Sequence, residues 1–266
     1  MMIDHIKRWL HWGDYDAQLS VVPRLLRAYL LWNNDWYGSH AMRYLPIVRF
    51  IRRLPDPIAY PILEVGSGDR GIAPFLRRSV VTVDLNFDPE NMKRVGAMKV
   101  PVRGEIEHLP FLNDSFDMAI AVDILEHLPE NQRETSIKEL FRVARKYVAV
   151  AVPCGGKAVR VEGLLDRFHQ IRFGVPNKWL VEHKKNILPA VDVLSELFKK
   201  QSCFSTMKIE SNTHLILWFV LEALEIAAPS NYLRRIMTDW LVNLASRLRP
   251  RNAYRQIFYI GIKKYF

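Results

Sequence analysis

Residues 62–71 read ILEVGSGDRG and contain the glycines that decide between possible folds. Gly66, Gly68 and Gly71 have the G-x-G-x-x-G spacing of a loop that joins a first β-strand to a helix and lets the backbone approach a ligand closely. Glu64 stands two residues before the first glycine, and its charge would repel a pyrophosphate at short range. A carboxylate at this point suits a ligand that is cationic or that donates hydrogen bonds. The stretch therefore favours a nucleotide-type fold but argues against NAD.

Apolar and amphipathic segments alternate on the C-terminal side of this loop. A helix is predicted from about Ile72, with Pro74 in its first turn, where a missing N–H group is tolerated. Together with the strand before the loop, the apolar runs predict strands at 61–65, 79–85, 98–104, 116–123 and 147–153, and a helix at 130–145. Such alternation predicts an α/β fold with a doubly wound parallel sheet.

The N-terminal part of the chain is predicted to be helical. Residues 1–57 have apolar side chains at helical spacing, and Pro55 and Pro57 end this section. We therefore expect an N-terminal helical extension over 1–57, followed by one domain over 58–266.

The C-terminal part continues the domain. A helix is predicted at 187–200, and strands are predicted at 204–211 and 254–266 because apolar residues alternate there. The stretch 215–249 reads as helical. It would then be a helical insertion between the last two strands.

Composition limits the class of protein. With 49% hydrophobic and 25% charged residues, the chain is expected to form a packed soluble core. The most apolar run, 215–228, contains Glu222 and Glu225 and is too short to span a bilayer, and the N-terminus lacks the apolar core of a signal peptide. Cys154 and Cys203 form no C-x-x-C pair, and no His/Cys cluster has zinc spacing. We therefore expect a reduced, cytoplasmic setting and no metal.

The net charge of +10 is concentrated near the C-terminus. Residues 229–266 hold eight basic residues against Asp239 alone, a net charge of about +7. A basic face there could meet nucleic acid, an acidic membrane surface or an anionic substrate, and a basic surface without a partner is the alternative. The eight residues are Arg234, Arg235, Arg247, Arg249, Arg251, Arg255, Lys263 and Lys264.

The chain resembles the class I S-adenosylmethionine-dependent methyltransferases, with a methyltransferase type 11-like domain, in four segments that occur in the family's order. These segments are ILEVGSGDRG, VVTVDLN, GEIEHLPFLNDSFDMAIAVDILEHL and RETSIKELFRVARKYVAVAVP, within about residues 60–153. The resemblance implies S-adenosylmethionine as cofactor. It also implies a Rossmann-like seven-stranded sheet with helices on both faces and a seventh strand antiparallel beside the fifth, which 204–211 and 254–266 suit.

The resemblance assigns the glycine loop to the methionine part of the cofactor. The family's E/D-x-G-x-G motif matches Glu64, Gly66, Ser67 and Gly68. Many members have a further glycine two residues after the second one, whereas this chain has Arg70 there. An arginine near a sulfonium is a departure from the family pattern.

The resemblance assigns two further places to the adenosine. The acid that binds the ribose matches Asp84, which ends the second strand, with Leu85 beside the adenine. The ribose assignment also follows from the position of Asp84 alone, although a turn or helix-capping acid would explain it too. An acid and an apolar residue that contact the adenine match Glu105 and Ile106, or Glu107 in a shifted register.

Three residues are candidates at the reacting end. Asp123, at the end of the fourth strand, is expected to bind the cofactor next to its reactive side, and it is also a candidate base. His127 and His183 are the other candidate bases, the second with Glu182 and Trp179 nearby in sequence. A histidine that binds backbone at a helix start would explain His127 equally well, and a surface helix turn would explain His183.

The acceptor is expected to be a small molecule or a lipid-linked compound. The apolar and basic stretch 215–249 allows peripheral membrane contact, with a lid or a dimer face as alternatives. Nucleic acid is not favoured, because aromatic-rich basic strands are missing. The sequence does not predict the oligomeric state.

Two other functions stay open at this point. An NAD-dependent oxidoreductase or epimerase would use the same sheet, but no Tyr-x-x-x-Lys-type signature occurs in the proper region. A non-catalytic, methyltransferase-like binding protein is permitted by Arg70.

Overall fold

The computed structural model describes residues 37–55, 58–68, 71–76, 78–88, 99–227 and 250–263. Residues 1–36 of the predicted extension, residues 228–249 of the predicted insertion, and Arg70 lie outside these ranges. Within them, no helix combines the length and the apolar character needed to cross a bilayer.

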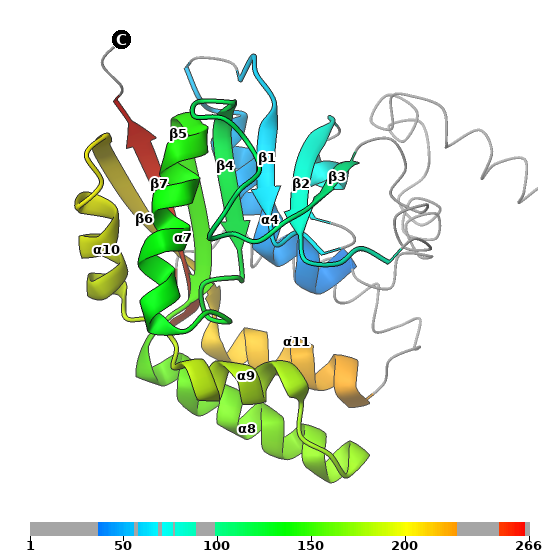
Figure 1. The fold of residues 1–266 in the computed structure, drawn as a ribbon. Coiled ribbons are helices and arrows are strands. Elements are labelled where there is room, and N and C mark those ends of the chain that lie inside the picture. The colour runs from blue at the N-terminus through cyan, green and yellow to red at the C-terminus, as the bar shows by residue number, and fades with distance from the viewer. Residues whose placement is uncertain are drawn as a thin grey trace, which may run out of the picture.

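A seven-stranded sheet forms the centre of the fold, as predicted (Figure 1). Its order is β3-β2-β1-β4-β5-β7-β6. The first five strands pair in parallel, and β7 runs antiparallel to both β5 and β6. The strands are β1 Ile62–Val65, β2 Val80–Asp84, β3 Lys99–Arg103, β4 Phe116–Val122, β5 Ala144–Pro153, β6 Phe204–His214 and β7 Ala253–Ile262.

Helices cover both faces of the sheet, so the doubly wound prediction is confirmed. On one face, helices α7, Glu130–Val143, and α10, Val191–Lys199, share a core with the strands. On the other face, helix α4, Tyr37–Ile51, and the short helix α5, Ala73–Leu76, share a second core. Strand β4 lies between these cores and is buried at all seven positions, as its apolar sequence requires.

Three further helices, which we call the cap, lie at the carboxyl ends of the parallel strands (Figure 1). They are α8, Gly155–Phe173, α9, Lys178–Asn186, and α11, Leu215–Ala227. A separate apolar core joins them, and in it Trp218 of α11 stacks on Tyr254 of β7 with 3.8 Å between ring centroids. The cap therefore covers the edge of the sheet where ligands bind in open α/β folds.

The sequence did not predict α8 and α9. Helix α8 begins at Gly155-Gly156, which reads as a loop, and ends at Gly174, whose φ of 75° is the left-handed conformation of a helix C-cap. The side chain of Asn177 caps α9 by accepting hydrogen bonds from the backbone of Trp179 and Leu180. Helix α11 covers the first part of the predicted insertion.

A buried ion pair ties β7 to the end of β4 across β5. Arg255 donates from Nε and from one Nη to the two carboxylate oxygens of Asp123, each at 2.6 Å. Arg43 of α4 adds a contact of 3.3 Å to the same carboxylate. Arg255 is 2% exposed, so its inclusion in a basic C-terminal surface was wrong. It neutralises an internal acid instead.

Removal of Arg255 should destabilise the fold far more than removal of a surface lysine. Arg255→Met leaves the Asp123 carboxylate buried with only Arg43 beside it, and we expect a loss of about 3–5 kcal/mol in the free energy of unfolding. The matched control is Lys138→Met, which breaks the exposed pair with Glu134 and should change that free energy by less than about 0.5 kcal/mol. Urea unfolding followed by circular dichroism measures both, and equal effects would contradict the structural role of the pair.

Candidate active site

The glycine loop follows β1 and is shaped by backbone conformations that favour glycine. Gly66, Gly68 and Gly71 have φ values of 69°, 53° and 60°. A side chain at Gly66 would collide with Ile124, whereas the space above Gly68 is open. The open space leaves room for a ligand at the tip of the loop.

Glu64 of β1 is joined to this loop through one of its two carboxyl oxygens. Its side chain is fully buried, and Oε2 accepts a hydrogen bond of 2.8 Å from the backbone N–H of Ile72. Oε1 has no hydrogen-bond partner in the described part of the chain. Burial raises the pKa of Glu64 above its ordinary value, while the Ile72 N–H, the nearby Lys99 and a hydrogen bond with Tyr44 act in the opposite direction. A buried carboxyl with one unused acceptor oxygen suits a ligand that brings a positive hydrogen-bond donor.

Lys99 supports the loop from the start of β3. It is 5% exposed, and its ammonium group donates to Ser67 Oγ at 3.1 Å and to the carbonyl of Gly68 at 2.7 Å. No local pattern in the sequence indicates this role, because Lys99 reads as an ordinary strand residue.

The predicted adenosine residues lie at the carboxyl ends of β2 and β3. Asp84 Oδ2 accepts a hydrogen bond of 2.8 Å from the backbone N–H of Gly68, so this acid is joined to the glycine loop. Leu85 is 63% exposed and Glu105 is exposed. Ile106 is buried in the core shared with α7 and α10, and Glu107 is half-buried. Their contacts with a cofactor stay predictions, but the exposed positions of Leu85 and Glu105 leave them accessible.

Asp123 differs from the other predicted residues because its carboxylate is already engaged. Burial works against its ionisation, but Arg255 and then Arg43 outweigh burial and lower the pKa of Asp123. A carboxylate in a bidentate contact with arginine is a weak proton acceptor. The geometry therefore favours a positioning role for Asp123 over the role of base.

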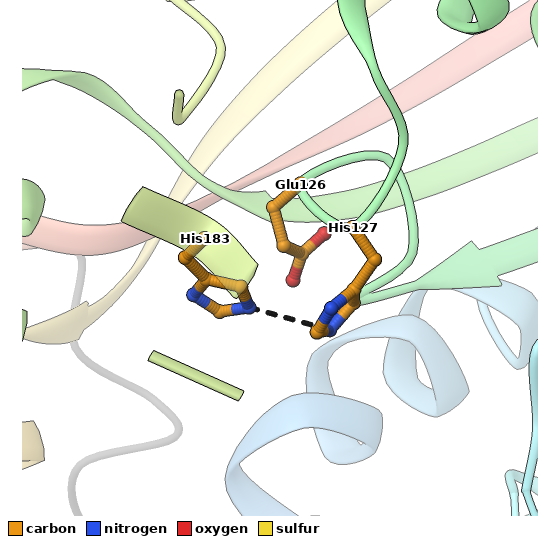
Figure 2. Close-up of side chains that lie close together, drawn as sticks. All are labelled: Glu126, His127 and His183. Carbon is orange, nitrogen blue, oxygen red and sulfur yellow. Dashed lines mark hydrogen bonds between the residues drawn. The ribbon is translucent and has the colours of Figure 1, made fainter. Parts of the chain in front are cut away.

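The two candidate histidines meet at the boundary between the sheet and the cap (Figure 2). His127 lies in the loop after β4 and His183 lies on α9, and their Nε2 atoms are 3.3 Å apart. His183 is 7% exposed, so it does not lie in a surface helix turn. Trp179 packs edge-on against His127 with 5.5 Å between ring centroids.

A carboxylate binds the outer nitrogen of each histidine. Glu182 lies 2.9 Å from His127 Nδ1, and Glu162 of α8 lies 2.9 Å from His183 Nδ1. Tyr254 also donates a hydrogen bond of 2.7 Å to Glu162. The sequence suggested a pair of Glu182 with His183, but the structure places Glu182 against His127. No sequence pattern indicated Glu162, which lies 21 residues from His183 in the chain.

Glu126 completes the cluster, and its carboxyl points toward the two rings (Figure 2). Its side chain is fully buried, and neither oxygen has a hydrogen-bond partner among the described residues. Burial, and then the negative charge of Asp123, raise the pKa of Glu126 well above its usual range. Burial also lowers the pKa of His127, and the neighbouring His183 lowers it further, against the opposing effect of Glu182.

Residues 63–151 match a protein-family model described as "Methyltransferase domain". The matched range runs from β1 to β5 and holds the glycine loop, Asp84, Asp123 and His127. No curated protein matches the chain at the level of sequence.

Several solved structures share the fold. A methyltransferase from Thermotoga maritima, described as a possible histamine N-methyltransferase, is 19% identical, with a TM-score of 0.51 over 91% of this chain and 97% of its own. Phosphoethanolamine N-methyltransferase 2 from Haemonchus contortus, solved with S-adenosylmethionine, is 16% identical, with a TM-score of 0.53 over 96% of this chain but 61% of its own. Magnesium protoporphyrin IX methyltransferase from Synechocystis, solved with the demethylated cofactor, is 11% identical, with a TM-score of 0.50 over 98% and 94% of the two chains.

At these identities the solved structures show only a shared fold. The family match also includes the glycine loop and the acids that follow it in the sequence. The strand order, with β7 antiparallel beside β5, is the one that the sequence resemblance implied. The free oxygen of Glu64 and the open space above Gly68 fit a cationic adenosine cofactor. Residues 63–151 thus carry a methyltransferase domain, the described residues have the fold of the class I S-adenosylmethionine-dependent methyltransferases, and S-adenosylmethionine is the cofactor that this domain implies.

Proposed function

We propose that this methyltransferase acts on a small-molecule or lipid-linked acceptor that reaches the cofactor between the carboxyl edge of the sheet and the cap. The observation that carries the proposal is the meeting of His127, from the loop after β4, with His183, from α9. Polar groups from both layers converge there, next to Asp123 and the glycine loop. The phosphoethanolamine and porphyrin enzymes that share the fold act on small molecules, which agrees with such an acceptor.

In this proposal the described residues hold the cofactor along the strand ends. Glu64, with the loop from Gly66 to Gly68, would bind the methionine part, and Asp84 would bind the ribose. Leu85 with the pair Glu105 and Ile106 would contact the adenine. When bound, S-adenosylmethionine supplies a methyl group on a positively charged sulfur, so the protein must chiefly hold the acceptor in line with it.

The two imidazoles would act on the acceptor. Because a carboxylate binds Nδ1 of each ring, each Nε2 is the nitrogen that keeps its lone pair when the ring is neutral. An Nε2 lone pair can accept a proton from an oxygen or nitrogen nucleophile. His127 is partly exposed, and His183 supports it from inside.

The cap also offers a surface for a membrane. Helices α8 and α9 and the turn between them expose large apolar side chains together with basic ones. The apolar ones include Leu164, Ile171, Phe173, Val175 and Trp179, and the basic ones include Arg160, Arg167, Arg172, Lys178, Lys184 and Lys185. We infer that this surface contacts an acidic lipid surface, because apolar insertion and positive charge act together there. A cytoplasmic enzyme held at the membrane periphery would reach a lipid-linked acceptor in this way, and this location is part of the proposal.

Loss of Asp84 should weaken cofactor binding, and loss of Glu105 and loss of Glu107 should differ in their effect on cofactor affinity. Asp84→Ala removes charge-assisted hydrogen bonds to the ribose, and we expect an increase of about 10- to 100-fold in the Kd for S-adenosylhomocysteine. Glu105→Ala should also weaken binding, whereas Glu107→Ala should leave it unchanged. Calorimetric titration measures all three, and equal affinity of the Asp84 variant and the wild type would remove the ribose assignment.

Cofactor binding should depend on pH through Glu64. The positive ammonium of S-adenosylmethionine favours the ionised carboxyl, so affinity should rise as the pH rises above the ordinary value of 4.5 through the raised pKa of Glu64. The charged or titratable groups that face this carboxyl are Tyr44, Lys99 and Asp84. In the unliganded protein the sign is reversed: the native state holds the proton more tightly than the unfolded chain, so stability falls with rising pH over the same interval.

The Glu64→Gln variant should lack both pH effects and bind the cofactor weakly throughout. The exposed Glu105→Gln variant is the control, and it should keep both pH effects. Calorimetry across the pH series gives the affinities. A rise in affinity of the same size in Glu64→Gln and wild type would contradict the role of Glu64.

Membrane contact should depend on the exposed apolar residues of the cap. Ile171→Glu replaces a side chain that is 85% exposed on α8, and it should strongly reduce sedimentation of the protein with vesicles that contain phosphatidylserine. The control is Leu112→Glu, a change of the same kind at a position that is 82% exposed in the loop before β4. Equal sedimentation of the two variants would refute the membrane surface.

A further inference from the structure

The cluster of Glu126, His127 and His183 has an arrangement that proton transfer alone does not explain. The two rings turn their Nε2 atoms toward each other, and these atoms are 3.3 Å apart (Figure 2). With carboxylates on both Nδ1 atoms, the neutral rings would present two lone pairs to each other at this distance. Such an arrangement needs a positive charge between or beside the nitrogens, either a shared proton or a cation.

Glu126 points to a cation rather than a proton. Its carboxyl is fully buried and has no hydrogen-bond partner in the part of the chain that the structure describes. A buried carboxyl without a partner stays neutral, and it ionises at little cost only when it is paired or when it coordinates a metal. One ligand atom from each of the three residues can be chosen so that all lie within 4.8 Å of one another.

The neighbouring arginines are engaged with other groups. Arg255 and Arg43 contact Asp123. Arg133 donates to the backbone carbonyls of four residues, Leu125, Leu128, Asn186 and Ile187. Among the described residues, the nearby guanidinium groups are therefore directed away from the three carboxyls, Glu126, Glu162 and Glu182, that surround the imidazoles.

The distances fit a transition-metal ion. Two nitrogen ligands on a tetrahedral zinc ion, each at about 2.0–2.1 Å from the metal, stand roughly 3.3–3.4 Å apart. The two Nε2 atoms have this separation before any ion is added. The ligand atoms of all three residues lie within 4.8 Å of one another, so the Glu126 oxygen is at most about 1.5 Å beyond the spacing between ligands on a tetrahedral zinc ion.

The carboxylates bound to the two Nδ1 atoms also indicate a metal site. Histidines that bind metals commonly donate their second ring N–H to a carboxylate, which fixes the tautomer and the orientation of the ring. Glu182 does this for His127, and Glu162 does it for His183. Tyr254 in turn orients Glu162. Both rings are thus held with the metal-binding nitrogen turned inward.

We propose that Glu126, His127 and His183 form a binding site for a divalent transition-metal ion such as Zn²⁺. The sequence predicted no metal, because Glu126 and His127 are separated from His183 by more than fifty residues and show no zinc spacing. Three protein ligands leave at least one coordination position for water or for an oxygen or nitrogen atom of a bound molecule. The proposal goes beyond the proposed function and does not require it, and a bound ion would occupy the Nε2 lone pairs that otherwise accept the proton of the acceptor.

Metal binding can be measured without cofactor or acceptor. The full chain, freed of metal with a chelator, is titrated with ZnCl₂ by calorimetry, and with CoCl₂ while the visible absorption of the cobalt ion is recorded. We expect saturation at one ion per chain, with the intense cobalt absorption of a tetrahedral site. Absence of saturable zinc binding would overturn the proposal and would indicate a shared proton between the rings. It would leave the assignment as a methyltransferase untouched.

Variants locate the site. Glu126→Gln and His183→Gln should lose zinc affinity by more than the loss of about 10- to 100-fold expected for the outer variants Glu162→Gln and Glu182→Gln. His108→Gln changes an exposed histidine in the loop after β3 and should bind zinc as the wild type does. Thermal unfolding without metal shows whether each variant is folded. Wild-type zinc affinity in folded Glu126→Gln and His183→Gln would contradict the site.

Discussion

The contact between Asp123 and Arg255 is the constraint on which the site depends. Asp123 directly follows β4 and has a φ of 54°, a left-handed conformation that costs a non-glycine residue about 1–2 kcal/mol. The bidentate contact with Arg255 fixes this residue, together with a hydrogen bond of 2.8 Å from its N–H to the carbonyl of Ala151. The loop that starts at Asp123 carries Glu126 and His127, so the last strand determines where these side chains lie.

Neighbouring residues of β7 join the sheet to the cap. Arg255 binds Asp123 in the sheet, whereas Tyr254 stacks on Trp218 of α11 and donates to Glu162 of α8. Glu162 then orients His183 of α9. Two adjacent residues at the start of β7 therefore position groups of both the sheet and the cap. Because the antiparallel strand β7 lies beside β5, Arg255 reaches Asp123 and Tyr254 reaches Glu162, which orients His183.

The sheet and the cofactor loop were predictable because their signals are local. Apolar runs mark the strands, and Glu64 and Asp84 stand at fixed places relative to the glycines. The partners of these residues were not predictable. Arg255 reads as one more basic residue near the C-terminus, and it meets Asp123 across 132 positions of the chain. Lys99 and Glu162 lack any local pattern, and the two glycines that begin α8 read as a loop, so the sequence did not predict this helix.

The most direct test of the account is a crystal structure of the full chain grown with S-adenosylhomocysteine. We predict that the amino-acid end lies over Gly66 and Gly68 with its ammonium toward Glu64, and that the ribose hydroxyls lie within hydrogen-bond distance of Asp84. The sulfur should face the side chains of Asp123 and His127. A ligand bound elsewhere, or in the reverse orientation along the strand ends, would contradict the account.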